Sequence, residues 1–534
     1  MSVSTKASRM NPRWPYLLCA AVLTINCSGC SLKEWFHNGF KVGPNYCPPV
    51  EPVASTWIDY SDERIVQGPA DLSAWWNTFN DPVLNNLIQT ARFQNLSLRE
   101  AGARILEYRA RLQYAEGNMF PQVQEGVGTF FDQRLSEKVA NAAPDSKFGT
   151  WDVGLNATWE LDFWGRFRRS IEEAEAELDA SVENYDDVMV LLLAEVARAY
   201  TNLRTAQERM RYAQANVIAQ EGSLKIAEDR FRLGASTERD VAQAKAVLET
   251  TRSFIPAFEA GVRLANNQLC VLLGTPPRDM TAELGEASIP TSTPEVTVGI
   301  PANLVRRRPD VRRAERELAA QSARIGIATT NLYPHFGLNG SIGVTAQDFD
   351  DLFDGSQSAS GGFGPYFRWD LLNYGRLKSL IEVEDAQFEQ LLWAYQQQVL
   401  IAGREAEDGL VSYLRGQERV SNLAASVVAG ERALEITLEQ YRQGAVDFTP
   451  VYIASGTLAT QQDLFATARG ATTQSLIDLY RALGGGWEIR LNQGVRITRV
   501  INRDDVGDNQ QVPPAVPQDN EELVSPIPST DSQQ

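Results

Sequence analysis

The sequence has very little histidine and lacks the common catalytic motifs. Only His37 and His335 occur in 534 residues, although histidine is a frequent general base and metal ligand. The chain also has no Gly-x-Ser-x-Gly elbow and no phosphate-binding Walker loop. We therefore expect that the protein is not an enzyme and that it holds no cofactor and no metal.

Basic clusters and long hydrophobic runs are also missing. The formal net charge is −18, from 50 Lys and Arg against 68 Asp and Glu. This balance argues against a nucleic-acid partner, because phosphates attract cationic surfaces. Beyond the N-terminus no apolar run approaches the roughly 20 residues of a membrane-spanning helix. Entry into a bilayer would therefore require barrel strands or a covalent lipid.

The N-terminus resembles a bacterial lipoprotein signal. Basic residues precede a short apolar stretch at residues 16–25, and the small residues Ser28 and Gly29 come directly before Cys30. This pattern predicts a signal peptide at residues 1–29 and acylation of Cys30. One position departs from the lipoprotein pattern, because a cysteine stands three residues before the cleavage site where leucine is usual. An ordinary cleaved signal is the alternative.

Two very long proline-free stretches have a helical pattern. In residues 171–234, apolar side chains recur every three or four positions between Val188 and Val217. Residues 376–443 form a second such stretch. As a single helix each would be about 95–100 Å long, at 1.5 Å per residue. The sequence therefore predicts long coiled-coil helices that span a distance no compact domain needs.

Other segments alternate between apolar and polar residues and predict two β-hairpins. The alternating segments are residues 148–161, 336–344 and 363–371. Val123, Val127 and Phe131 indicate the strand that pairs with the first of them. Long alternating strands with aromatic residues near their ends are typical of transmembrane barrels. A half-exposed soluble hairpin is the alternative.

The second half of the chain repeats the first. Gly165, Gly234 and Gly274 each recur 210 residues later, which indicates a tandem duplication. Four strands per chain are too few to close a barrel, since the smallest have about eight, so a barrel requires oligomerisation.

The predicted segments are a signal peptide (1–29), a lipid-anchored extended segment (30–80), a first repeat of helix, hairpin and long helical hairpin (81–275), a linker (276–301), a second repeat (302–490) and an acidic tail expected to be disordered (491–534).

Short motifs follow one another in a fixed order through the mature chain. They include NDPVLNNLI, WELDFWGRFRR, FRLGASTERDVAQAKA, LLGTPP, RRRPDVRRAERELAAQSARIGIA, YRQGAVDF and LYRALGGGW. Together they resemble the TolC-like family of outer membrane factors, in particular the lipoprotein branch that serves RND-type drug-efflux pumps. The resemblance implies a mainly α-helical homotrimer, in which each chain gives four strands to a 12-stranded transmembrane β-barrel and long helices to a periplasmic α-helical barrel.

The resemblance also implies a role for the turns that end the long helices. In the family these turns face a periplasmic adaptor, which places adaptor contact on Arg232, Leu233, Gly234, Ala235, Ser236, Arg442, Gly444 and Val446. Glycine suits a helix C-terminus that needs a left-handed residue. Arg442 and Asp447, with Asp240 as a weaker candidate, are candidate gate residues that link the helices; simple exposure is the alternative. Relatives commonly have an acid where this chain has Ile453, which argues against an acidic selectivity ring.

The leading interpretation is the exit duct of a tripartite efflux pump. It would lie in the cell outer membrane, anchored by lipid and extending into the periplasm, and conduct substrate passively from an inner-membrane RND-type transporter and a membrane-fusion adaptor. One alternative is the duct of a one-step protein secretion system. Another is a periplasmic coiled-coil lipoprotein scaffold without a pore, which the alternating strands disfavour. The cargo is not identified, although scarce His and Met weigh against a dedicated copper or silver duct.

Overall fold

The computed structural model describes residues 32–50, 53–67, 71–134, 136, 138, 147–298 and 307–492. The predicted signal peptide, Cys30 and almost all of the predicted acidic tail lie outside these residues. Within them the chain divides into two compact units. The sheet unit comprises the residues up to 48, 109–177 and 317–392. The helical unit comprises residues 49–108, 178–316 and those from 393 onward.

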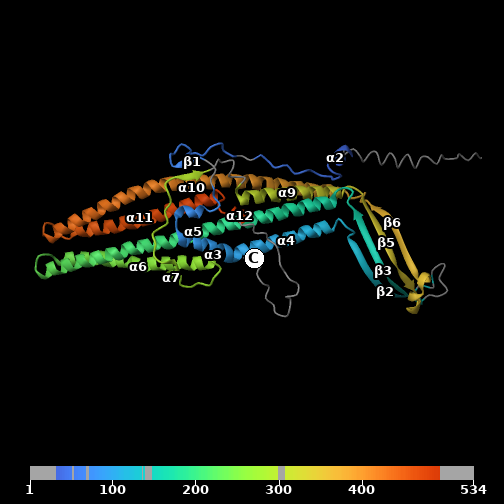
Figure 1. The fold of residues 1–534 in the computed structure, drawn as a ribbon, viewed down its shortest axis with the longest axis horizontal. Helices are drawn as coiled ribbons and strands as arrows, with labels where there is room; N and C mark the ends of the chain where they lie inside the picture. The colour runs from blue at the N-terminus through green and yellow to red at the C-terminus, as the bar shows by residue number, and fades with distance from the viewer. Residues whose placement is uncertain are drawn as a thin grey trace, which may run out of the picture. The chain divides into compact units, whose positions relative to one another are not determined.

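Helices make up most of the described chain (Figure 1). The longest are α5 (Arg166–Arg232) and α10 (Arg376–Arg442), each an unbroken helix of 67 residues, which confirms the two predicted long helices. The others are α2 (Leu32–His37), α3 (Pro82–Gln94), α4 (Leu96–Gly117), α6 (Glu238–Leu272), α7 (Thr281–Leu284), α9 (Pro309–Thr330), α11 (Thr449–Ala482) and α12 (Ile489–Asn492), with short 3-10 turns η1 (Trp75–Phe79), η2 (Asp350–Phe353) and η3 (Gly355–Gln357).

The duplication is visible in the backbone. Gly165 and Gly375 have φ of 83° and 85°, and the other two glycine pairs, also 210 residues apart, match equally well. Positive φ favours glycine because it has no Cβ to clash. All three landmark pairs therefore mark the same left-handed corner in both repeats.

Four antiparallel strands form the sheet of the sheet unit, in the order β2-β3-β5-β6 (Figure 1). They are β2 (Val123–Arg134), β3 (Lys147–Leu161), β5 (His335–Ala346) and β6 (Ala359–Arg368). The two hairpins join through β3 and β5, where Leu155 lies opposite Ile342. The prediction that the last strand reaches Leu371 is wrong, because β6 ends at Arg368. A separate parallel pair, β1 (Ile65–Gln67) with β4 (Val296–Val298), was not predicted.

The strand register places one apolar and one polar face on this sheet. Directly opposed residues point to the same side, so Trp151, Leu155, Ile342 and Phe363 share one face. Leu155 is 62% exposed, and Ile342 on β5 and Phe363 on β6 are exposed as well. The apolar face is therefore uncovered in the single chain. On β2, the apolar residues that predicted the strand do not lie on this face.

The residues that suggested β2 lie on the opposite side of the sheet. Val123, Val127 and Phe131 oppose Thr158, Gly154 and Thr150, which are on the polar face. Opposite Trp151, Val153 and Leu155, β2 instead has Phe130 and two glycines, and the same face continues with polar residues at both ends of the strand. The partner strand was thus predicted at the right place but with its faces exchanged.

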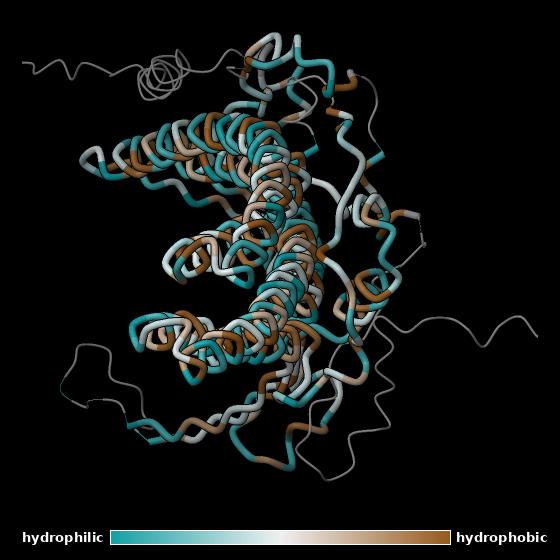
Figure 2. The backbone as a smooth tube through the Cα atoms, turned by 90° about the vertical axis from the view of Figure 1, so that its left-hand side faces the viewer, coloured by the Kyte–Doolittle hydropathy of each residue, from teal (hydrophilic) through white to brown (hydrophobic). Residues whose placement is uncertain are grey.

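The main core of the helical unit gathers η1, α3, α5, α6, α10 and α11. Trp75 stacks on Tyr480 with ring centroids 5.3 Å apart, and both tryptophans of η1 are buried. Asp81 caps α3: its carboxylate accepts from the backbone N–H groups of Val83 and Leu84 at 2.9 and 3.1 Å. Figure 2 shows hydrophobic and hydrophilic positions mixed along the helices. Among the described residues, no helix combines the length and apolar character needed to cross a membrane.

Buried ion pairs fix the start of α9 and the C-terminal end of the described chain. Arg308 is almost fully buried and binds Asp310 at 2.7 Å and Glu405 at 2.9 Å. Burial alone would raise the pKa of Asp310, but the hydrogen bonds from Arg308 and other groups outweigh it and lower the pKa. Arg490 of α12 pairs with the fully buried Asp186 at 2.7 Å. These arginines are therefore structural.

Replacing Glu183 by glutamine is expected to change how stability depends on pH. Burial outweighs the ion pair of Glu183 with Arg312 and raises its pKa from 4.5 to about 7. Between these values the folded chain binds a proton that the unfolded chain has lost, so stability falls as the pH rises through this range. Chemical unfolding in detergent, followed by circular dichroism, should show this decline for the wild type and a flatter profile for Glu183→Gln. Parallel profiles would contradict the assignment.

Candidate functional site at the two helical turns

Both long helices end in the same backbone motif. Gly234 after α5 has φ of 71°, and Gly444 after α10 has φ of 76°. In the first turn the N–H of Gly234 donates to the Phe231 carbonyl at 2.9 Å, and that of Ala235 donates to the Arg230 carbonyl at 2.8 Å. The second turn repeats both bonds 210 residues later. A left-handed glycine with these two bonds is the Schellman motif, so each helix stops for the same local reason.

The Arg230 side chain joins the two turns. Its guanidinium donates to the carbonyl oxygens of Tyr441 at 2.6 Å and Arg442 at 3.1 Å, in the last turn of α10. It also donates to the Ala235 carbonyl at 3.2 Å in its own turn. The guanidinium carbon lies 4.9 Å from the centre of the Tyr441 ring. A cation at a helix C-terminus is favourable because of the helix dipole.

A small apolar core lies under the turns. Tyr441 and Phe448 pack edge to face with centroids 5.2 Å apart, and both are buried together with Val451. Ala227 and Ala244 complete the core from the first hairpin, which is formed by α5 and α6. Burial raises the pKa of Tyr441 above its ordinary value of 10. The core therefore holds the two helical hairpins together at this end.

The charged groups near the turns form ion pairs that differ from those expected from the sequence. Asp447 accepts from Arg239 of α6 at 2.8 Å, and this pair links the two hairpins. Arg442 reaches only Glu439 of its own helix, at 3.7 Å. Asp240 is buried and accepts from the Thr237 hydroxyl at 3.0 Å. The candidate gate residue Asp447 thus has an inter-hairpin partner, and the partner is Arg239.

Most of the residues predicted to contact an adaptor are exposed. Leu233 is 80% exposed, and Arg232, Gly234, Ala235, Arg442 and Gly444 are also on the surface, while Ser236 and Val446 are half-buried. Val446 packs against the small core. Sequence reasoning missed Arg230 and Arg239. Comparing the two repeats could have found both, because the positions 210 residues later are Gln440 and Thr449.

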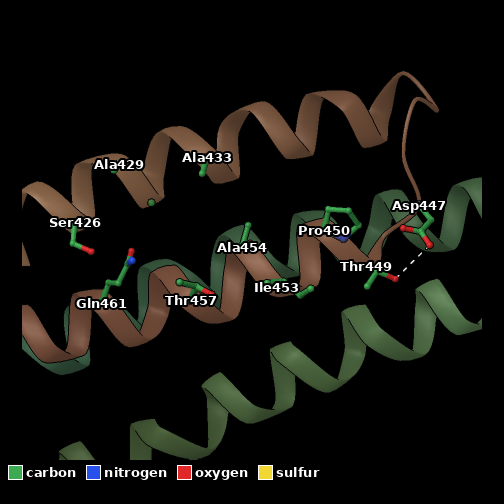
Figure 3. A pocket seen from close by; sticks show the side chains of 11 residues that line it. Ser426, Ala429, Ala433, Asp447, Thr449, Pro450, Ile453, Ala454, Thr457 and Gln461 are labelled. Carbon is green, nitrogen blue, oxygen red and sulfur yellow. Dashed lines mark hydrogen bonds between the residues drawn. The ribbon is translucent and has the colours of Figure 1, made fainter.

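A shallow groove of about 740 Å³ runs beside the second turn, between α10 and α11 (Figure 3). Its lining is dominated by small or short side chains: Ser426, Ala429, Gly430, Ala433, Asp447, Thr449, Pro450, Ile453, Ala454, Thr457 and Gln461. Ile453 is largely exposed here. Small side chains allow close approach of another helix. Among the described residues, no cluster of His, Cys, Asp and Glu is placed to hold a metal.

Comparison with known proteins accounts for this arrangement. The profile of the outer membrane efflux protein family matches residues 87–275 and 300–485. The chain belongs to this family. The matched ranges contain nearly all of both repeats, both turns and the whole four-stranded sheet.

Individual members of the outer membrane efflux protein family match nearly end to end. The chain is 31% identical over 493 residues to the pyoverdine export outer membrane protein OpmQ of Pseudomonas putida, across 89% of this chain and 98% of that one. It is 27% identical over 475 residues to the toluene efflux pump outer membrane protein TtgF of Pseudomonas putida, across 87% and 96%. The solved structure of the outer-membrane channel OprN has a TM-score of 0.79 at 31% identity, across 84% and 99%.

Removing the Arg230 guanidinium is expected to loosen the second turn. Arg230→Ala removes the two hydrogen bonds that the guanidinium donates to the last turn of α10, at a cost of about 1–2 kcal/mol. Hydrogen–deuterium exchange of residues 441–446 should therefore be faster in this variant. Arg232→Ala is the matched control, because Arg232 is highly exposed and pairs only with Asp229 of its own helix. Equal exchange in the two variants would show that Arg230 does not hold the turn.

Proposed function

We propose that the protein is the exit duct of a tripartite efflux pump in the outer membrane. It conducts small molecules passively to the exterior after an inner-membrane RND-type transporter and a periplasmic membrane-fusion adaptor deliver them. Family membership and the channel-forming relatives support this function. The observation in the structure that supports it best is the uncovered apolar face of the four-stranded sheet.

The dimensions of that face suit a lipid bilayer. Trp151 and Leu161 are ten residues apart on β3, or about 33 Å along the strand. A tilt of about 40° reduces this to about 25 Å, the height of the apolar band of outer-membrane barrels. Aromatic rings flank the band at both ends. Phe130 and Phe349 contact Trp151 at one end, with centroids 4.5 and 5.1 Å apart.

Unpaired strand edges support a homotrimer. Within the described residues, β2 and β6 each pair on one side only. An unpaired edge leaves backbone N–H and C=O groups unsatisfied, which is very costly in hydrocarbon. Pairing β6 of one copy with β2 of the next closes a barrel of 12 strands from three copies. The long helices of the same three copies then form the periplasmic α-helical barrel.

The two turns are the proposed docking and gating end. Exposed Leu233 and the turn glycines offer backbone and apolar surface to an adaptor, and the groove at Ala429 and Ala433 allows a helix to approach closely. The Arg239–Asp447 pair and the hydrogen bonds of Arg230 hold the hairpins together until a partner separates them. No step makes or breaks a covalent bond, so the channel itself does no chemistry.

The two alternative functions fit less well. A coiled-coil scaffold without a pore has no use for an outward apolar sheet face. A protein-secretion duct shares the fold, but the named relatives export pyoverdine or toluene, which supports small-molecule export. These two cargoes differ greatly in chemistry, so the similarity supports a class of function and no single substrate.

Membrane insertion is expected to fail when a charge is placed on the apolar face. Leu155→Arg puts a guanidinium near the middle of the band, where it costs about 2–4 kcal/mol. The fraction of heat-stable trimer recovered in outer-membrane extracts should fall several-fold. Asn156→Arg is the matched control, because Asn156 is the next residue of the same strand and lies on the polar face. Equal loss in both variants would argue against a lipid-facing role for this face.

Weakening the turn contacts is expected to increase conductance in planar bilayers. Arg239→Ala and Asp447→Ala each remove the exposed ion pair between the hairpins, worth about 0.2–1 kcal/mol, so open events should become more frequent. Arg432→Ala is the control, since Arg432 pairs with Glu435 inside α10. Absence of any conductance, in the wild type and in every variant, would refute the duct.

A further inference from the structure

Residues 39–42, which follow the predicted lipid site Cys30, are held against the beginning of α5 by Arg168 and Arg169. We call these contacts the clasp. Arg168 donates to the carbonyl oxygens of Gly39 and Phe40, the latter at 3.0 Å. Arg169, whose side chain is almost fully buried, donates to the carbonyl of Val42 at 3.1 Å. The Val42 N–H in turn donates to the Trp164 carbonyl at 3.0 Å. Side-chain hydrogen bonds from two arginines and one backbone hydrogen bond therefore fix residues 39–42 within the sheet unit.

The second repeat lacks the two arginines of this clasp. They correspond, 210 residues later, to Lys378 and Ser379. Serine is too short to repeat the contacts of Arg169. The two repeats therefore differ at the point where the N-terminal segment docks.

Aromatic rings continue from this segment onto the sheet. Phe36 contacts Phe40 at 5.3 Å between centroids, Phe40 contacts Trp35 at 4.8 Å, and Trp35 stacks on Phe163 at 5.1 Å. Phe163 then contacts Phe336, the first apolar residue of β5, at 5.3 Å. The row of rings thus joins the N-terminal segment to the end of the apolar sheet face.

These rings are solvent-exposed in the single chain. Phe36 is 63% and Phe40 is 42% exposed, and Phe163 and Phe367 at the same end of the sheet are exposed too. Phe367 lies 6.5 Å from Phe336. Exposed aromatic rings grouped beside an apolar band mark a surface that contacts another apolar phase.

We infer that Phe36 and Phe40 are part of the lipid-contacting surface, at the periplasmic boundary of the outer membrane. The clasp holds them level with the end of the sheet's apolar face, and helix α2 begins two residues after Cys30. This inference rests on the proposed outer-membrane position of the sheet. A lipid surface fits better than a second copy of the chain, because the rings are continuous with the lipid-facing band.

Nitroxide labels on the full-length trimer in phosphatidylcholine vesicles test this inference. Phe36→Cys and Phe40→Cys are each made in a Cys47→Ser background, which removes the exposed thiol; Cys270 is buried. Relaxation by oxygen, which partitions into lipid, is compared with relaxation by a water-soluble nickel chelate. Leu155→Cys reports the lipid-facing band, and Leu233→Cys reports the exposed turn. The background without an introduced cysteine corrects for residual labelling.

The expected result is that both phenylalanine positions favour oxygen, as Leu155→Cys does, while Leu233→Cys favours the nickel chelate. Labels at positions 36 and 40 that behave like position 233 would overturn the inference and leave the membrane position of the sheet intact. If the label at Leu155→Cys instead favours the nickel chelate, the proposed membrane position of the sheet is itself refuted. Labels that neither reagent reaches would show that another copy of the chain covers the rings, which also overturns the inference.

Discussion

A strand in hydrocarbon must have both of its edges paired, and this constraint determines much of the proposed assembly. The sheet ends in β2 and β6, which have 12 and 10 residues. Each unpaired backbone group would cost several kcal/mol in lipid, so an isolated chain could not remain there. Pairing between copies solves the problem. The same number of copies then sets how many long helices surround the duct, because each chain contributes its strands and helices in a fixed ratio.

Duplication gave the protein two equivalent turns, but the contacts that hold them together are not equivalent. Arg230 reaches across from the first hairpin to the end of α10, and Gln440 occupies its position in the second repeat. Arg239 likewise corresponds to Thr449, so only one hairpin supplies the cation for Asp447. The local fold of each turn comes from its glycine, which both repeats keep. Association between the turns comes from residues that diverged.

The sequence predicted features that depend on local spacing. Strict alternation located β3 almost to the residue, and the glycine offset identified the repeats. It did not predict which face of β2 is apolar, because glycines occupy that face and Phe131 lies on the other. Nor did it predict the Arg239–Asp447 pair, since the rotation of one helical hairpin against another depends on packing across some 200 residues. The clasp at Arg169 depends on such long-range contacts as well.

Fewer buried contacts hold the turns than hold the rest of the helical unit, and the proposed gating depends on this difference. The main core contains several tryptophans and tyrosines and the buried Arg490–Asp186 pair, whereas the core under the turns contains only five buried residues. Removing one partner of a buried ion pair costs about 3–5 kcal/mol, but an exposed pair such as Arg239–Asp447 contributes about 0.2–1 kcal/mol. In the proposed gating, a partner that binds Leu233 and its neighbours with a few kcal/mol would therefore separate the turns while the main core stays folded.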